Sequence, residues 1–232
     1  MTTLLIATRN RHKVGEIRAI LGGRFDYLSL DDFPAAPKVV EDADTFAGNA
    51  TKKAVELARW LSGASLVTRH PSLFVLADDS GLEVDALGGQ PGVYSARFAA
   101  GDSARSGNTP DADNNAKLLR LLKTVPLEKR TARFRCVIAL VPVPEGKVEN
   151  ASPVCFADEL AAHVFDGACE GRIQLSASGQ NGFGYDPLFV PAGFDRSFAE
   201  LGDEVKNQLS HRARALEKLK PWLDAQSATR TR

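Results

Sequence analysis

Two adjacent aspartates, Asp78 and Asp79, directly follow the apolar run at residues 73–77 and precede Ser80 and Gly81. An apolar run bounded by turn residues is typical of a buried strand that ends there. Two carboxylates in such a place are costly, because crowding and desolvation both disfavour ionisation. A divalent cation would compensate them, and magnesium prefers oxygen ligands completed by water and substrate phosphates. The pair therefore indicates metal-assisted phosphate chemistry, although a simple turn with capping aspartates would use the same residues.

The segment after this pair specifies a particular backbone shape. Residues 82–85 alternate apolar and acidic side chains, as a half-exposed strand does, and residues 88–92 place three glycines and a proline in one tight connection. Arg97 follows, and its planar guanidinium suits a phosphate or a carboxylate.

A second polar segment, residues 8–13, separates the strand predicted at 3–7 from a helix predicted at 14–21. The free N–H groups and the dipole of a helix N-terminus favour an anion. The segment is not a Walker loop, because it lacks the glycines and the GK[ST] ending. These residues alone leave an anion site and an ordinary solvated helix start equally open. The members of the segment are Thr8, Arg9, Asn10, Arg11, His12 and Lys13.

A third segment, residues 179–187, places Phe183 among glycines. Glycines allow close backbone approach, so this ring could be a stacking platform for a base. A tight turn around a core phenylalanine would have the same composition. Downstream, a helix is predicted over 206–223, and its first turns carry Lys206 and the run at 210–212.

The string ADDSGLEVDALGGQPGVYSARF at 77–98 closely resembles the signature of the inosine triphosphate pyrophosphatase family, which hydrolyses noncanonical purine nucleoside triphosphates. Further family motifs recur in the same order along nearly the whole chain. They are Ser/Thr-x-Asn-x-x-Lys at Thr8, Asn10 and Lys13, GFGYDP at 182–187, and Lys-x-x-x-Ser-His-Arg at 206–212.

The resemblance implies a role for each motif. Glu41 and Asp79 would hold Mg²⁺, and Asp79 would be the general base with Asp78 in support, although Asp78 or a hydroxide on the metal could be the base instead. Lysines would carry the phosphates, since preorganised positive charge supplies most of the help in phosphoryl transfer. The substrate-binding residues implied are Thr8, Arg9, Asn10, Arg11, His12, Lys13, Lys53, Ser80, Phe183, Gly184, Tyr185, Asp186, Lys206, His211 and Arg212.

The chain departs from the family pattern at several positions, and two of these departures remove a glutamate. Gly48 stands where family members commonly have Glu, which removes a capping-box partner for Thr45. Val205 stands where they usually have Glu before the lysine, so a pairing made by that Glu is lost or moves to Glu204.

The order of predicted elements indicates an α/β fold. The resemblance implies an elongated two-lobed domain, with a central mixed β-sheet flanked by helices and the site in the cleft between the lobes. One domain is expected over 1–224, with a sheet-rich lobe at roughly 130–175 and a flexible tail at 225–232. The other predicted elements are strands at 24–30, 132–140, 154–156 and 161–165, helices at 45–61 and 111–122, and a surface loop at 64–72.

Composition excludes several classes of protein. Lys plus Arg equals Asp plus Glu at 29 each in 232 residues, so no basic field exists to hold a nucleic acid. The three cysteines, Cys136, Cys155 and Cys169, lack metal-site spacing and fit a reducing compartment. No apolar run is long enough for a signal-peptide core or a membrane span, so we expect a cytoplasmic protein without a membrane partner. The family resemblance also implies that the protein forms a homodimer.

The implied activity is hydrolysis of ITP, dITP and XTP to the monophosphate and pyrophosphate, which removes these nucleotides from the pool. Two alternatives remain open. The chain could hydrolyse another modified nucleotide, such as a pyrimidine triphosphate, with the same phosphate-binding residues. It could also bind a nucleotide as a regulator without turning it over.

Overall fold

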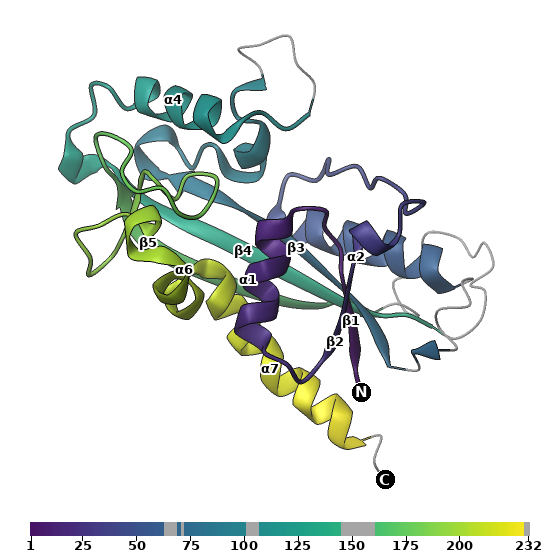
Figure 1. Ribbon diagram of the computed structural model, residues 1–232. Coiled ribbons are helices and arrows are strands. Elements are labelled where there is room, and N and C mark those ends of the chain that lie inside the picture. The colour runs from purple at the N-terminus through teal and green to yellow at the C-terminus, as the bar shows by residue number, and fades with distance from the viewer. Residues whose placement is uncertain (63–68, 71, 101–106, 145–160, 230–232) are drawn as a thin grey trace. The chain divides into compact units, whose positions relative to one another are not determined.

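The structure is a computed structural model, and it describes residues 1–62, 69–70, 72–100, 107–144 and 161–229 (Figure 1). Some of the sequence predictions lie outside these ranges. They are the strand at 154–156, Cys155, residues 64–68 and 71 of the surface loop, and residues 230–232 of the tail.

A six-stranded mixed sheet has the strand order β2-β1-β3-β4-β5-β6. The first strand is parallel to both of its neighbours, whereas β5 and β6 are antiparallel. β1 is buried along its whole length, as expected for a strand covered on both faces. The predicted α/β fold with a mixed sheet is confirmed. The strands are β1 (Thr3–Ile6), β2 (Asp26–Ser29), β3 (Leu73–Val84), β4 (Thr131–Pro142), β5 (His163–Ile173) and β6 (Phe189–Pro191).

The α-helices begin and end at residues whose side chains suit those places. Asn10 caps the first helix, Gly22 follows its last turn with a positive φ of 77°, and Ser197 forms a capping box with Glu200. Among the described residues no helix is both long and apolar enough to cross a membrane. The helices are α1 (Arg11–Leu21), α2 (Phe46–Ser62), α4 (Asp111–Leu121), α6 (Phe198–Leu209) and α7 (His211–Thr229).

The chain divides into two compact units, and three strands contribute to both. The first unit comprises Met1–Asp79, Val137–Asp166 and Ala215–Arg232, and the second comprises Ser80–Cys136 and Gly167–Arg214. The second unit therefore differs from the lobe that we expected at 130–175. The reason is that β4 and β5 are long strands, and each passes from one unit into the other.

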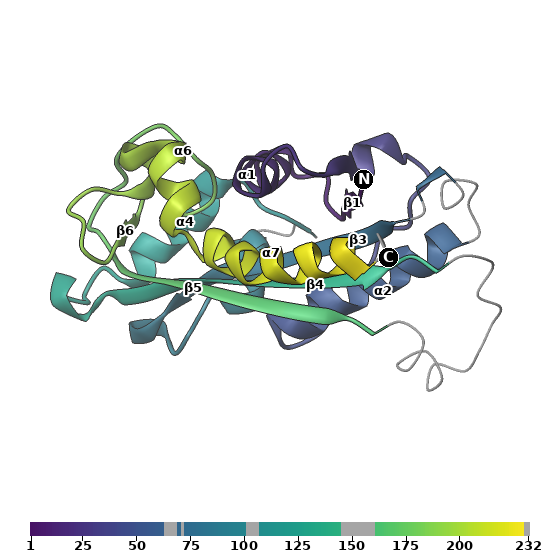
Figure 2. The same cartoon turned by 90° about the horizontal axis from the view of Figure 1, so that it is seen from below.

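In the first unit, α1 and α2 lie on opposite faces of the sheet (Figure 2). Successive side chains of a strand point to opposite faces. On β3, Phe74 packs its ring edge-to-face against Trp222 of α7, with 5.7 Å between centroids, and Asp78 faces α1. Asp79 faces α2 instead. The two aspartates therefore point away from each other.

Four predicted boundaries were wrong. β3 does not end at the aspartate pair but runs on to Val84, so the strands predicted at 73–77 and 82–85 are one strand. β5 extends to Ile173, well beyond the segment predicted at 161–165. The helix predicted over 206–223 is two helices, because α6 ends at Leu209 and Ser210 leaves helical geometry with ψ 163°. Helix α7 continues to Thr229, so the predicted tail at 225–232 begins as a helix.

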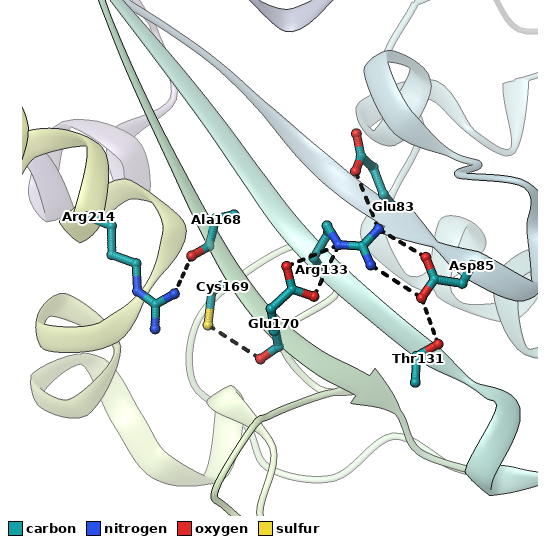
Figure 3. Close-up of polar contacts among 8 residues, drawn as sticks. All are labelled: Glu83, Asp85, Thr131, Arg133, Ala168, Cys169, Glu170 and Arg214. Atoms are coloured by element: carbon teal, nitrogen blue, oxygen red, sulfur yellow. Dashed lines mark hydrogen bonds and ion pairs between the residues drawn. The ribbon is translucent and has the colours of Figure 1, made fainter.

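An ion-pair network ties three strands of the second unit together on an exposed face of the sheet (Figure 3). The Arg133 guanidinium lies 2.9 Å from Asp85 and 3.1 Å from Glu170, and Glu83 is 3.9 Å away. Asp85 also accepts a hydrogen bond from the Thr131 hydroxyl at 2.6 Å. That bond and then Arg133 lower the pKa of Asp85. The opposite face of these strands packs into the apolar core of the unit.

Candidate active site

In the first unit, Asp78 lies against Lys13. The Asp78 side chain is 1% exposed, and Lys13 Nζ, from the first turn of α1, donates to its Oδ1. A buried carboxylate is unfavourable unless a positive group compensates it. Asp78 therefore has a counter-charge within the chain and does not depend on an external cation.

On the opposite face of β3, Asp79 is 7% exposed, and its Oδ2 accepts a hydrogen bond from Asn49 Nδ2 at 3.0 Å. Burial raises the pKa of Asp79 above its usual value. Lys13 and the Asn49 hydrogen bond lower this pKa, Glu41 raises it, and Lys53 lowers it. A carboxylate with a raised pKa is a better proton acceptor than an ordinary aspartate, and such groups concentrate at functional sites.

Asn49 also fastens the loop that leads into α2. Its side chain is 1% exposed, and its Oδ1 accepts from the Ala43 backbone N–H at 2.9 Å. The loss of a cap expected at Gly48 is only partial, because the Gly48 N–H still donates to Thr45 Oγ1 at 3.0 Å. A Cβ at Gly48 would lie 2.7 Å from that of Ala43, so a glutamate there would need the loop to move.

The same loop brings Glu41 to Lys53 of α2. The two side chains form an ion pair, and Lys53 Nζ also donates to the main-chain oxygen of Asp78 at 3.2 Å. The neighbouring pair, Lys52 and Asp42, is more exposed, with 2.6 Å between nitrogen and oxygen. Of the two lysines, only Lys53 is therefore directed to the aspartate pair. We call Glu41, Asn49, Lys53, Asp78 and Asp79, together with Lys13, the Asp79 cluster.

The polar segment at 8–13 uses much of its own hydrogen-bonding capacity. Asn10 Oδ1 accepts from the N–H groups of His12 at 3.0 Å and Lys13 at 3.3 Å, and Thr8 Oγ1 accepts from the Asn10 N–H at 3.1 Å. Three backbone donors that we had expected to be open to an anion thus have acceptors already. Thr8 and Asn10 shape the loop, and an anion there would rely on side chains such as Lys13.

The two arginines of this segment have partners away from the aspartate pair. Arg11 is 90% exposed and lies 3.6 Å from Asp31, and Arg9 donates to the Ala36 carbonyl at 3.4 Å. Both contacts are long for hydrogen bonds, and exposed ion pairs contribute little to stability. The structure therefore does not bring Arg9 or Arg11 into the Asp79 cluster, and their substrate role stays a prediction.

Two carboxylates of the Asp79 cluster suit a magnesium ion. The described residues contain no group of three or more His, Cys, Asp or Glu side chains that could hold a metal. Magnesium needs fewer, since it commonly takes one or two carboxylates and completes its shell with water and phosphates. Glu41 and Asp79 belong to the same unit, and Glu41 is near enough to raise the pKa of Asp79. Their oxygens therefore fit the ion.

In the second unit, His211 and Arg212 begin α7 and are 4% and 1% exposed. Arg212 Nη2 donates to Ser80 Oγ at 3.0 Å. The His211 ring stacks on Phe134, with 4.8 Å between centroids and 15° between planes. Both residues are therefore held in fixed orientations by packing. The separation of α6 from α7 at Ser210 is what places them at a helix start.

Asp186 holds two other predicted residues of this unit. It is 1% exposed, and its Oδ2 accepts from the Phe183 N–H at 2.9 Å and from Lys206 Nζ at 2.5 Å. Lys206 Nζ also lies 4.3 Å from the centre of the Phe183 ring, a cation–π arrangement. Gly182 is needed beside this pair, because a Cβ there would contact the Asp186 carboxylate. Lys206 thus has a counter-charge although Val205 replaces the family's Glu.

Three functional candidates were missed by the sequence analysis. Asn49 stands within the apolar stripe of α2, and a buried amide in such a stripe was a signal that could have found it. Asp111 and Asn115 of α4 contact the backbone of Gly184, a residue 69 or more positions away in the chain. No local pattern predicts that contact.

The sequence profile of the Ham1 family matches residues 4–222. The chain belongs to the Ham1 family. This confirms the resemblance inferred from the motifs. A dITP/XTP pyrophosphatase from Shouchella clausii is 44% identical over 97% of this chain and 98% of that protein. One from Geobacter sulfurreducens is 48% identical over 96% of this chain and 97% of its own length.

Solved structures of the family share the fold. The Ham1 protein of Staphylococcus aureus superposes with a TM-score of 0.73 at 32% identity, over 97% of this chain and all of that one. The structure titled nucleoside-triphosphatase / dITP/XTP pyrophosphatase from Mycobacterium abscessus has a TM-score of 0.64 at 40% identity, over 95% of this chain and 100% of its own.

Proposed function

We propose that this chain hydrolyses the noncanonical purine nucleoside triphosphates dITP, XTP and ITP to the nucleoside monophosphate and pyrophosphate. A water oxygen bonds to the α-phosphorus, the bond from that phosphorus to the oxygen bridging to the β-phosphorus breaks, and pyrophosphate leaves. The observation that carries the proposal is buried Asp79 among Lys13, Lys53 and Glu41, in a chain that is 44% and 48% identical to dITP/XTP pyrophosphatases.

In this reaction Asp79 takes the proton of the attacking water. Its burial raises its pKa and so increases its basicity, while Lys13 and Lys53 limit the rise. The same two ammonium groups are the ones we propose to bind phosphate oxygens. Fixed positive charge in a site of low dielectric stabilises the charge that develops on the phosphates. Asn49 holds the carboxylate in one orientation.

We also propose that Mg²⁺ binds at Glu41 and Asp79. When bound, the ion would neutralise charge on the phosphates and favour loss of a proton from water. The chain's own contribution is the loop at 41–45, which Asn49 and Thr45 fasten to the first turn of α2. This anchoring keeps the Glu41 carboxylate on the same side of the sheet as Asp79.

The second unit supplies the residues proposed to recognise the base. The Phe183 ring, oriented by Asp186 and Lys206, is a stacking surface. His211 and Arg212 are donors suited to a 6-oxo group. A site that donates to that oxygen would leave polar groups unpaired against the amino group of adenine, and such mismatches can discriminate by roughly 10⁴-fold. GTP shares the 6-oxo group, so its 2-amino group must be what excludes it.

A substrate panel with pyrophosphate detection tests the proposal. We expect kcat/KM for ITP, dITP and XTP to exceed the values for GTP and ATP, and activity to vanish on chelation of magnesium. Modified pyrimidine triphosphates belong in the panel, because the phosphate-binding residues alone would accept them. Equal efficiency on GTP and ITP would refute the purine selectivity, and pyrophosphate release from none of the compounds would refute the enzyme assignment.

A homodimer in the cytoplasm completes the proposal. Its support is the family resemblance. Light scattering coupled to size-exclusion chromatography distinguishes a monomer of 25.0 kDa from a dimer of twice that mass.

A further inference from the structure

One helix holds the backbone of Gly184 through both of its polar groups. Asp111 Oδ2 accepts from the Gly184 N–H at 2.6 Å, and Asn115 Nδ2 donates to the Gly184 carbonyl at 3.0 Å. Asp111 and Asn115 are four residues apart at the start of α4, so they lie on the same helix face. All three residues belong to the second unit. We call this pair of hydrogen bonds the Gly184 clamp.

No packing on its Cβ side fixes the position of Gly184. Apart from Gly184 and its two chain neighbours, no residue has a heavy atom within 4 Å of where its Cβ would be, and its φ of 64° is one that glycine adopts easily. A glycine with open space on its Cβ side has more backbone conformations available than other residues. The clamp is therefore a main restraint on this peptide, and it fixes the N–H and the carbonyl together.

The residues on either side of Gly184 are anchored separately, so the peptide between them is where the loop can shift. The Phe183 N–H donates to Asp186, and the Tyr185 hydroxyl donates to the Ser95 carbonyl at 2.9 Å. Tyr185 is 4% exposed, so its ring cannot follow a shift of the loop. A change at Gly184 should therefore shift Phe183 more than Tyr185, because Phe183 is part-exposed and Tyr185 is buried.

We propose that Asp111 and Asn115 are positioning residues for base selectivity, which they set by fixing the backbone between Phe183 and Tyr185. The inference rests on the proposed function, in which Phe183 stacks on the base. Neither α4 residue needs to touch the nucleotide. Their effect is on where the ring of Phe183 lies, and the Asp79 cluster is in the other unit of the chain.

The chemistry of the two bonds provides matched variants. Asn115→Asp keeps the size of the side chain but places oxygens against the Gly184 carbonyl, which removes the donor. Asp111→Ala removes the acceptor for the Gly184 N–H. Asp111→Asn keeps an acceptor oxygen at the same place and should preserve that bond. Asp113→Asn, at an exposed position of the same helix turn, is the control for the loss of a helix N-terminal charge.

The first measurement is the ratio of kcat/KM for ITP to that for ATP. In Asn115→Asp and Asp111→Ala we expect this ratio to fall about tenfold, which corresponds to the loss of one charge-assisted or well-aligned hydrogen bond. The fall should come mainly from KM for ITP, with kcat on saturating ITP nearly unchanged. Asp111→Asn and Asp113→Asn should keep the wild-type ratio. Equal losses on both nucleotides, or no change in the ratio, would overturn the inference.

The second measurement does not depend on catalysis. Hydrogen–deuterium exchange of peptides covering 180–187 should be about tenfold faster in Asp111→Ala than in Asp113→Asn, because the Gly184 N–H loses its acceptor. Unchanged exchange would show that the clamp does not hold the loop, and the inference would fail. If the wild type shows no preference for ITP over ATP, the proposed function fails instead, while the exchange result still decides whether the clamp restrains Gly184.

Discussion

Replacing Asn49 by leucine tests whether the Asp79 carboxylate is held as the structure indicates. Leucine has the same branching and the same number of side-chain heavy atoms as asparagine and suits the apolar stripe of α2, so no cavity should form. The substitution removes the donor to Asp79 Oδ2 at 3.0 Å and the acceptor of the Ala43 N–H at 2.9 Å. The change in stability then reports mainly on these two hydrogen bonds, with a further cost from packing the larger leucine at this buried position.

The expected magnitude follows from the type of each bond. A hydrogen bond to a charged group contributes about 1.5–3 kcal/mol, and a neutral one about 0.5–1.5 kcal/mol, so Asn49→Leu should lower the free energy of unfolding by about 2–4 kcal/mol. For a chain of this length the midpoint of thermal unfolding should fall on the order of 10 °C. The bond to Asn49 lowers the pKa of Asp79, so its loss raises that pKa further. The destabilisation should therefore be largest where Asp79 is ionised and shrink as the pH falls.

Urea unfolding of the metal-free protein at several pH values, with kcat/KM measured in parallel, provides the assay. Asn49→Asp is the matched variant, because it keeps an acceptor for Ala43 but sets a second carboxylate against Asp79. It should lose activity with less disturbance of the loop. If Asn49→Leu unfolds at the wild-type urea concentration and retains wild-type kcat, the reasoning about the Asp79 cluster is wrong.

Three further substitutions probe single charges. Asp79→Asn should reduce kcat by about 10²-fold or more through loss of the base. Because burial raises the folded pKa of Asp79, the stability that this carboxyl group contributes is present at low pH and lost as the pH rises. In thermal melts at neutral pH this variant should therefore match or exceed the stability of the wild type. Lys13→Met should lower the free energy of unfolding by about 3–5 kcal/mol in chemical denaturation, because the buried Asp78 carboxylate would lose its counter-charge. Wild-type stability of this variant would contradict the prediction. Arg133→Gln should cost about 1 kcal/mol or less, because the pair is part-exposed. The pKa of Asp85 is lowered by Thr131 and then by Arg133, so this loss should appear in melts at neutral pH and fade as the pH falls through the range where Asp85 protonates.

The sequence predicted those elements whose signals are local. Apolar spacing located α1 and α2, although α1 begins at Arg11, three residues before its predicted start. Thr45, the predicted cap of α2, accepts from the Gly48 N–H. The alternation at 132–140 located β4. Such signals depend on a few neighbouring residues, and tertiary contacts do not override them here. The predicted end of α1 at Gly22 was correct for the same reason.

The errors arose where distant residues decide the structure. Asp78 and Asp79 resemble a strand end, yet β3 continues because Lys13 and Asn49 supply partners from helices that lie far away in the chain. Likewise, Lys206 and His211 lie in a segment predicted as one helix, and only the backbone at Ser210 separates α6 from α7. Local composition cannot report such compensation.

The candidate site shows what this compensation achieves. Because Asp78 and Asp79 are adjacent on a strand, their side chains point to opposite faces of the sheet. The two residues that suggested a shared cation therefore have different surroundings. The negative charge of Asp78 is neutralised by the ammonium group of Lys13. Asp79 accepts a hydrogen bond from the Asn49 amide, and burial raises its pKa. One carboxylate of the pair is thus fixed as part of the structure. The other, incompletely compensated, is the one suited to accept a proton.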